Sequence, residues 1–501
     1  MSAGRHPLET LVYPTRDAVH ELVGEGRRVP VSHTWIADCE TPVGAYLKLR
    51  DDEPAFLLES AEQGRLGRHS MLGGRPEAVL RSKDGRMTCT WNDGRVDELD
   101  AADPFGSVQR VVDGVGMVRP PGRVPPFLGG AVGYFGYDLV RTTEHLPNRP
   151  PDALGVPDLL MMLTGPIVTF DHLDRTITVT VPCALEGDVD AAFDAAVEKI
   201  EALKDELMGP IPRSVNEAPG SVGEVVGTLT QAEYEDVVER CREYVFAGDV
   251  FQVVPSLRFT AETTLDPFAI FRGLRAVNPS PYMFFLAFPE VSLAGSSPEL
   301  LVKVEGSTVA TRPIAGTRPR GETDEEDRRL AEELVADPKE RAEHVMLVDL
   351  GRNDIGRVSR TGTVRVSDLM SVERYSHVMH IESSVCGELR EGTNAADALR
   401  AVFPAGTLSG APKVRAMEII DEMEPTARGT YGGAVGFIGF DGDMDTCITI
   451  RTALCADGLV HVQAGAGIVA DSVPSVEYQE ARNKARGMLQ AIEVAASQED
   501  W

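Results

Sequence analysis

The sequence predicts a large fold that mixes β-strands with α-helices, built as two domains or as one intertwined body. The chain has 501 residues, which is long for a single hydrophobic core. Residues 1–210 consist mainly of short strand-like segments and turns, and residues 167–170 and 176–181 are typical of a β-hairpin. Residues 189–208 predict a long helix, so strands and helices follow one another along the chain.

The boundary between two regions is predicted where proline and glycine become frequent. Residues 209–228 hold Pro210, Pro212 and Pro219, which favour an irregular linker. A helix then begins sharply, because Thr230 and Glu233 have the spacing of a capping box. We therefore expect an N-terminal region 1–210, a linker 211–228 and a chemically active region 229–495.

Composition and charge exclude several classes of protein. The hydrophobic content of 43% is ordinary for a globular chain, and the net charge of −29 argues against a nucleic-acid or anionic-membrane surface. The first residues lack the apolar core of a signal peptide, and no apolar run is long enough for a membrane helix. The seven cysteines are scattered, without C-x-x-C pairs, so we expect a reduced cytoplasmic protein without a structural zinc site.

The segment 313–354 carries the strongest chemical signals. Its Pro-x-x-Gly-Thr pattern predicts a rigid turn, in which Gly316 lets the backbone approach a ligand closely. Downstream, Asp337 suits a helix N-cap, Pro338 the first helical position and Glu340 the acidic position of a capping box. A helix is therefore expected directly after this turn.

Two pairs of glutamates lie on predicted helices. Glu340 and Glu343 are three residues apart and share one helical face, and Glu477 and Glu480 repeat the spacing on a helix that starts near Pro474. Such pairs are most often solvated surface residues. If the two pairs face each other, they supply the oxygen ligands that Mg²⁺ prefers and leave positions for water and substrate.

A possible anion site follows from Arg451 and the backbone amides of residues 465–467. Arginine binds carboxylates through two parallel hydrogen bonds, and successive backbone amides form a concave anion site. Taken alone, Arg451 is more typical of a surface strand, and residues 465–467 are more typical of a tight turn.

Together these motifs resemble the chorismate-utilising enzymes, and within that family the large subunits of anthranilate synthase. The similarity is dense over residues 225–495 and looser in residues 57–60 and 129–138. The segments that carry it are Pro-Ile-Ala-Gly-Thr-Arg-Pro-Arg at 313–320, Glu-His-Val-Met-Leu-Val-Asp-Leu at 343–350, Ser-His-Val-Met-His at 376–380, the loop 406–413 and Gly-Ala-Gly-Ile-Val at 465–469.

The resemblance implies an α+β fold in which antiparallel β-sheets pack as a sandwich with helices outside and the active site in the central cleft. It implies that Glu343 and Glu480 bind Mg²⁺, with Glu340 and Glu477 assisting, and that the cation neutralises the ring carboxylate of chorismate. Ammonia would attack C2, the C4 hydroxyl would leave and pyruvate would be eliminated, which gives anthranilate for tryptophan biosynthesis.

The resemblance also assigns further site residues. The catalytic candidates are His380, Glu299 and Thr407. The first two match positions near the departing C4 hydroxyl, where a general acid would help it to leave. The substrate-binding candidates are Gly316, Thr317, Tyr431, Arg451, Gly465, Ala466, Gly467 and Lys484.

Two positions distinguish reactions within the family. Isochorismate and salicylate synthases carry a lysine base at the position of Gln252, and aminodeoxychorismate synthases typically carry lysine at the position of Ala315. Both departures favour anthranilate synthase. Aminodeoxychorismate synthase, 2-amino-2-deoxyisochorismate synthase and a non-catalytic relative that binds chorismate or tryptophan remain alternatives, although the four glutamates and Arg451 argue against the last.

The resemblance further implies a partner and an inhibitor. No cysteine lies on the glycine-flanked elbow of a glutamine amidotransferase, so we expect a separate amidotransferase subunit, in a heterotetramer. Feedback inhibition by L-tryptophan is expected at a site formed by Leu58, Glu59, Ser60, Asn278, Pro281, Tyr282 and Met283. Core packing beside an ordinary loop is the alternative for these residues.

Overall fold

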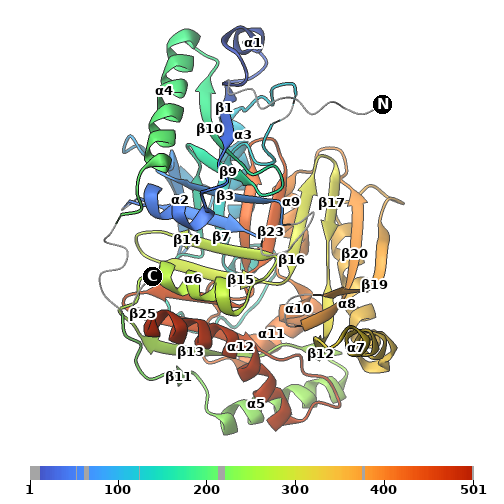
Figure 1. Ribbon diagram of the computed structural model, residues 1–501. Coiled ribbons are helices and arrows are strands. Elements are labelled where there is room, and N and C mark those ends of the chain that lie inside the picture. Colours follow the sequence, from blue (N-terminus) through green and yellow to red (C-terminus); the bar gives the residue numbers. More distant parts are fainter. Residues whose placement is uncertain are drawn as a thin grey trace.

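The computed structural model describes residues 12–51, 53–60, 67–122, 124–212, 220–374 and 378–498. Ser376 and His377 of the 376–380 motif and part of the predicted linker, residues 213–219, lie outside these ranges. Within them the chain folds into two large β-sheets with helices on their outer faces (Figure 1).

The first large sheet has eleven strands, and each neighbouring pair is antiparallel. Its strands, in spatial order, are β1 (Arg28–Ile36), β10 (Thr176–Ala184), β9 (Ile167–Asp171), β3 (His69–Gly74), β2 (Ala55–Glu59), β14 (Tyr282–Ala287), β15 (Ser292–Ser297), β24 (Thr452–Ala456), β25 (Leu459–Gly465), β13 (Ser256–Glu262) and β11 (Val226–Gly227).

The second large sheet has twelve strands and is also antiparallel. Its strands, in spatial order, are β18 (Ile314–Pro319), β20 (Val378–Glu388), β17 (Thr308–Thr311), β16 (Leu300–Glu305), β23 (Met444–Ile448), β22 (Ala434–Gly439), β7 (Gly130–Phe135), β8 (Leu159–Leu163), β4 (Ala78–Lys83), β5 (Arg86–Trp91) and β6 (Val96–Leu99), with β19 (Arg365–Arg374) beside β20. A small sheet joins β12 (Gln252–Val253) and β21 (Gly410–Ala411).

Alternate residues of the central strands separate an inner core from two outer ones. On β14, Phe284 and Leu286 join an inner cluster with Val132 and Tyr134 of β7, which belongs to the other sheet. The residue between them, Phe285, instead packs among the helices. Because successive strand residues point to opposite faces, this pattern places the two sheets face to face as a sandwich. The predicted α+β sandwich is confirmed.

Helices cover the outer faces of both sheets. The helices are α1 (Arg16–Glu21), α2 (Pro42–Leu49), α3 (Pro104–Val115), the 3₁₀ helix η1 (Tyr137–Thr142), α4 (Val189–Met208), α5 (Gln231–Ala247), α6 (Pro267–Val277), α7 (Asp324–Ala336), α8 (Pro338–Gly356), α9 (Ala395–Val402), α10 (Gly406–Ser409), α11 (Lys413–Met423) and α12 (Pro474–Ser497). Helices α2, α4, α5, α6 and α12 pack on the first sheet, whereas α3 and α9 pack on the second.

Both sheets take strands from both halves of the chain. In the first sheet β2 pairs with β14, and in the second β7 pairs with β22. The expected regions 1–210 and 229–495 therefore share their sheets and their inner core, as in one intertwined body.

The local predictions around the segment 313–354 need two corrections. The Pro-x-x-Gly-Thr pattern is an edge strand, β18, with a bulge where Gly316 has φ +64°, so the glycine allows an irregular strand and not a turn. Asp337 caps α8 by accepting hydrogen bonds from the amides of Lys339 and Glu340. The Glu340 side chain, however, does not complete a capping box, because it is paired with Arg318 at 3.0 Å.

Across the part of the chain that the structure describes, no helix combines the length and the apolar character needed to cross a lipid bilayer.

Candidate active site

Two candidate residues lie where the chain passes from one sheet to the other. Glu299 follows β15 of the first sheet and precedes β16 of the second, and Arg451 follows β23 of the second and precedes β24 of the first. The side chain of Arg451 makes no hydrogen bond or ion pair with a residue in the described ranges, although Tyr431, Glu480 and Glu299 interact with it electrostatically. Such a cation can accept a carboxylate ligand.

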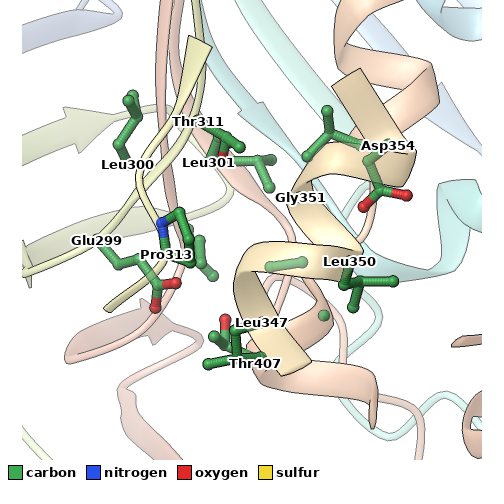
Figure 2. A pocket seen from close by; sticks show the side chains of 14 residues that line it. Glu299, Leu300, Leu301, Thr311, Pro313, Leu347, Leu350, Gly351, Asp354 and Thr407 are labelled. Carbon is green, nitrogen blue, oxygen red and sulfur yellow. The ribbon is translucent and has the colours of Figure 1, made fainter. Parts of the chain in front are cut away.

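Glu299 borders a small cavity of about 30 Å³ and is 7% exposed. Figure 2 shows its carboxyl group on one side of this cavity, with Thr407 of α10 below. Burial raises the pKa of Glu299 to about 8, although the Thr407 hydroxyl and the amide of Ile314 partly stabilise its charged form. Glu299 is therefore largely protonated at neutral pH and can donate a proton.

His380 lies on β20 opposite Thr317 of β18. Its Nδ1 is 2.9 Å from the carbonyl oxygen of Gly316 and 3.1 Å from the hydroxyl of Thr317. Because a carbonyl only accepts hydrogen bonds, Nδ1 carries the proton, and Nε2 is the acceptor nitrogen when the ring is neutral. Burial lowers the pKa of His380, partly offset by the bond to Gly316, so the neutral ring predominates at neutral pH.

The first glutamate pair lies on α8 beside the bulge of β18. A Cβ atom added to Gly316 would lie 2.9 Å from Oε2 of Glu340, so this glycine is needed for close contact with the carboxylate. Glu343 accepts a hydrogen bond from the amide nitrogen of Gln252 at 3.2 Å. Burial raises the pKa of Glu343; Gln252 opposes this shift, and Glu340 and Glu480 add to it by repulsion.

The second pair lies near the start of α12. Glu477 is 6% exposed, and burial raises its pKa, although a hydrogen bond with Ser472 opposes the shift. Glu480 forms an ion pair with Lys484 at 2.7 Å, and Lys484 also donates to the carbonyl oxygen of Gly465 at 3.0 Å. The lysine thus connects the second pair to the end of β25.

The two glutamate pairs lie near each other but are not arranged as a completed metal site. Glu343 is repelled by both Glu340 of its own helix and Glu480 of α12, so the two glutamate pairs lie near each other. In the described ranges, however, no three His, Cys, Asp or Glu side chains are grouped closely enough to hold a metal ion. Arg318 and Lys484 instead neutralise Glu340 and Glu480.

Gln252 and the segment 465–467 pack against each other beside these glutamates. A Cβ atom on Gly467 would lie 2.5 Å from Nε2 of Gln252, and one on Gly465 would lie 2.3 Å from the carbonyl oxygen of Pro255. Gly465 is therefore required for close packing against the backbone, whereas a side chain at Gly467 would displace the end of the Gln252 side chain. Ala466, between them, is fully buried, and Ile468 bridges to Val253 through backbone hydrogen bonds.

Tyr431 is held by a buried ion pair that the sequence did not indicate. Arg428 stacks over the rings of Tyr431 and Tyr137 and pairs with Glu424 at 2.6 Å. It also donates to the backbone carbonyls of Leu408 and Val254, each at 2.7 Å. Arg318 was likewise missed as an ion partner, although it stands in the quoted 313–320 motif.

The residues expected to bind tryptophan form a second group. Strand β2 pairs with β14 so that Glu59 lies opposite Met283 and Leu58 opposite Phe284. Glu59 forms an ion pair with Arg275 at 2.8 Å, and burial raises the pKa of Glu59 despite this arginine. Asn278 caps the end of α6 and accepts a hydrogen bond from Ser296. The two sequence segments thus meet directly, with an acidic group between them.

Comparisons with known proteins agree with this architecture. The chain belongs to the family of chorismate binding enzymes, whose model matches residues 53–490. Anthranilate synthase component 1 of Thermus thermophilus is 49% identical over 467 residues, covering 93% of this chain and 98% of that protein. The component 1 protein of Pseudomonas putida is 48% identical over 477 residues, covering 93% and 96%. The crystal structure of anthranilate synthase component I from Streptococcus pneumoniae has a TM-score of 0.75 and 37% identity, covering 91% of this chain and 98% of that one.

Proposed function

We propose that the chain is the chorismate-aminating component of an anthranilate synthase, which converts chorismate and ammonia into anthranilate, pyruvate and water. The observation that carries this proposal is the contact of Gln252 with Glu343. A primary amide has no proton chemistry suited to activating water, so the position at which isochorismate and salicylate synthases carry a lysine offers no base for adding water at C2. The many component 1 relatives support the same reaction.

The proton transfers can be assigned from the two titratable groups. Formation of the C2–N bond accompanies cleavage of the C4–O bond, and the departing oxygen takes a proton from Glu299 and leaves as water. The nitrogen releases one proton, so the charges balance. Glu299 suits the role of acid because its pKa is raised to about 8, whereas neutral His380 suits a proton acceptor in the later loss of pyruvate.

The four glutamates fit Mg²⁺ by the chemistry of their donors. The donor atoms that they offer are all carboxylate oxygens, which Mg²⁺ prefers. The negative charge of Glu343 is buried and is repelled by Glu340 and Glu480. Glu343 and Glu480 would hold the ion, and Glu340 and Glu477 would assist. A bound Mg²⁺ would neutralise the ring carboxylate of chorismate. Arg451 and the 465–467 amides would hold the other carboxylate, while Gly316, Thr317 and Tyr431 would line the ring.

A separate glutamine amidotransferase subunit, joined to this chain in a heterotetramer, would supply the ammonia. Six of the seven cysteines are buried, and burial raises the pKa of Cys89 to about 11 and of Cys241 to about 12. These thiols are poor nucleophiles at neutral pH. The purified chain should therefore form anthranilate from chorismate with ammonium but not with glutamine, measured by anthranilate fluorescence. Anthranilate from glutamine without a partner would contradict this assignment.

L-Tryptophan would inhibit the enzyme at the β2–β14 group. Glu59 lies buried beside Arg275, and Ser60 follows directly, so polar groups for an amino acid adjoin the apolar Leu58 and Met283. Ser60→Arg should weaken tryptophan inhibition by about tenfold or more, because hydrogen bonds to charged groups contribute roughly 1.5–3 kcal/mol.

The measurement is the inhibition constant in the ammonium assay, with Ser367→Arg on the exposed strand β19 as the control. Both variants should keep the parent kcat. If tryptophan inhibits the Ser60→Arg enzyme as strongly as the parent, these residues are ordinary core and loop residues and do not form an inhibitor site.

A further inference from the structure

The cavity beside Glu299 is bordered on one side by helix α8. Besides Glu299 and Thr407, it is lined by Leu347, Leu350, Gly351 and Asp354 of α8. Asp354 and Glu299 lie on opposite sides of it (Figure 2). Its volume of about 30 Å³ exceeds the roughly 10–15 Å³ that one water molecule needs.

Polar groups at both ends of this cavity are suited to water. The hydroxyl of Thr407 is buried beside the Glu299 carboxyl group, whose charged form it stabilises, and it makes no well-formed hydrogen bond with the residues that the structure describes. Asp354 is 3% exposed and pairs with Lys413 at 2.8 Å, and Lys413 also donates to the carbonyl oxygen of Val402, which lines the cavity. Buried polar groups without protein partners are usually satisfied by ordered water.

The end of α8 connects this cavity with a hollow at the protein surface. Residues 347, 350, 351 and 354 of α8 line the cavity, and Arg357 and Val358, which directly follow the last helical residue Gly356, line an open hollow of about 610 Å³. Ala401 of α9 lines the hollow and Val402 lines the cavity, so the two spaces also adjoin along a second helix. Asp354 therefore lines the cavity close to the end of α8, where the residues that line the open hollow begin.

We propose that the cavity holds one or two water molecules that connect the Glu299 carboxyl group with the Asp354–Lys413 pair and return a proton to Glu299 after each turnover. This role rests on the proposed function, in which Glu299 gives its proton to the leaving hydroxyl. The cavity water then donates a proton to the Glu299 carboxylate and takes one from the Asp354–Lys413 pair, which regains it from solvent at the Arg357 hollow. The proton that the attacking ammonia releases enters solvent, so the cycle balances.

Asp354 acts in this scheme through water and does not touch the substrate, so it is a positioning residue. Burial raises the pKa of Asp354, and Lys413 opposes this shift, which favours exchange of a proton between the pair and a neighbouring water. Leu347 and Leu350 form apolar walls of the cavity, so the polar groups are the ones that can bind water there.

The first test is a crystal structure of the chain at a resolution that shows ordered water. Density for one or two waters within hydrogen-bonding distance of Glu299 and Thr407 is expected. An empty cavity would overturn the proposal, because apolar cavities without sufficient polar partners remain dry. The presence of water in the cavity does not depend on the reaction. A chain that forms no anthranilate would contradict the proposed function, and the electron density would still show whether the cavity holds water.

The second test compares Asp354→Asn with Asp349→Asn, an exposed carboxylate on the same helix that pairs with Arg352. Asp354→Asn should lower kcat by about tenfold or more at unchanged KM, within the range that proton transfer contributes to enzyme rates. It should also enlarge the solvent deuterium isotope effect on kcat, which a purely structural role would not change. Asp349→Asn should match the parent.

If Asp354→Asn leaves Lys413 unpaired and unfolds the protein, the double variant Asp354→Asn/Lys413→Met removes both buried charges together. Its folded form should show the same loss of kcat and the same isotope effect. A folded variant with the parent's kcat and isotope effect would overturn the proton path.

Discussion

Glu299→Gln should lower kcat by roughly 10²–10⁴-fold, the range that general acid catalysis contributes, and leave KM for chorismate nearly unchanged. Glutamine keeps the size of the side chain but cannot give a proton to the departing C4 hydroxyl. Because Glu299 is buried between the two sheets, an acid from solvent cannot efficiently replace it as the proton donor. Steady-state kinetics with chorismate and ammonium measure the effect.

The role of Glu299 as the acid also predicts how kcat changes with pH. The pKa of Glu299 is raised to about 8, so its proton is present below this pH and lost above it. The parent kcat should therefore fall as the pH rises through about 8, and the Glu299→Gln variant should lack this limb. Glu305→Gln, an exposed glutamate at the end of β16, is the control and should match the parent. A Glu299→Gln enzyme within twofold of the parent would exclude Glu299 as the acid.

Glu343→Gln should reduce kcat/KM by roughly 100-fold or more, because charge stabilisation by a bound metal ion is worth several kcal/mol. The variant loses one negative oxygen ligand and keeps the contact partner Gln252 in place. Isothermal titration calorimetry should record weaker Mg²⁺ binding, and the kinetic assay should require more Mg²⁺ for half-maximal rate.

The control for the metal prediction is Glu493→Gln, on an exposed turn of α12 beyond Glu480. It changes the net charge by the same amount but lies away from the paired glutamates, so both Mg²⁺ binding and rate should equal those of the parent. Unchanged Mg²⁺ dependence in Glu343→Gln would mean that the two glutamate pairs are ordinary helix-surface residues.

Elements with local signals could be predicted from the sequence. The helix expected at 189–208 is α4 (Val189–Met208), the hairpin appears as β9 and β10, and the last helix starts at Pro474. The capping box of Thr230 and Glu233 and the left-handed stop at Gly248 are both present. In each case the periodicity or the cap lies within a few residues of the element that it specifies.

Features that depend on distant segments could not be predicted from local patterns. The pairing of Leu58 with Phe284 has no signal in either strand, and it determines that the two halves share one fold. Similarly, Glu340 was expected to cap its own helix, but Arg318 from β18 competes for the carboxylate. The spacing of the glutamates indicated their helical faces. The ion pair of Glu480 with Lys484 lies within one turn of α12, whereas the ion pair of Glu340 with Arg318 arises only from tertiary packing.

The most direct test of the central claim is the product that the purified chain forms from chorismate and Mg²⁺, identified by mass spectrometry with and without ammonium. Gln252, which contacts Glu343, offers no base for water at this position, and Ala315 offers no amine nucleophile. With ammonium, anthranilate and pyruvate should form without accumulation of aminodeoxychorismate. Without ammonium, chorismate should remain largely unreacted, and substantial isochorismate or salicylate would contradict the account.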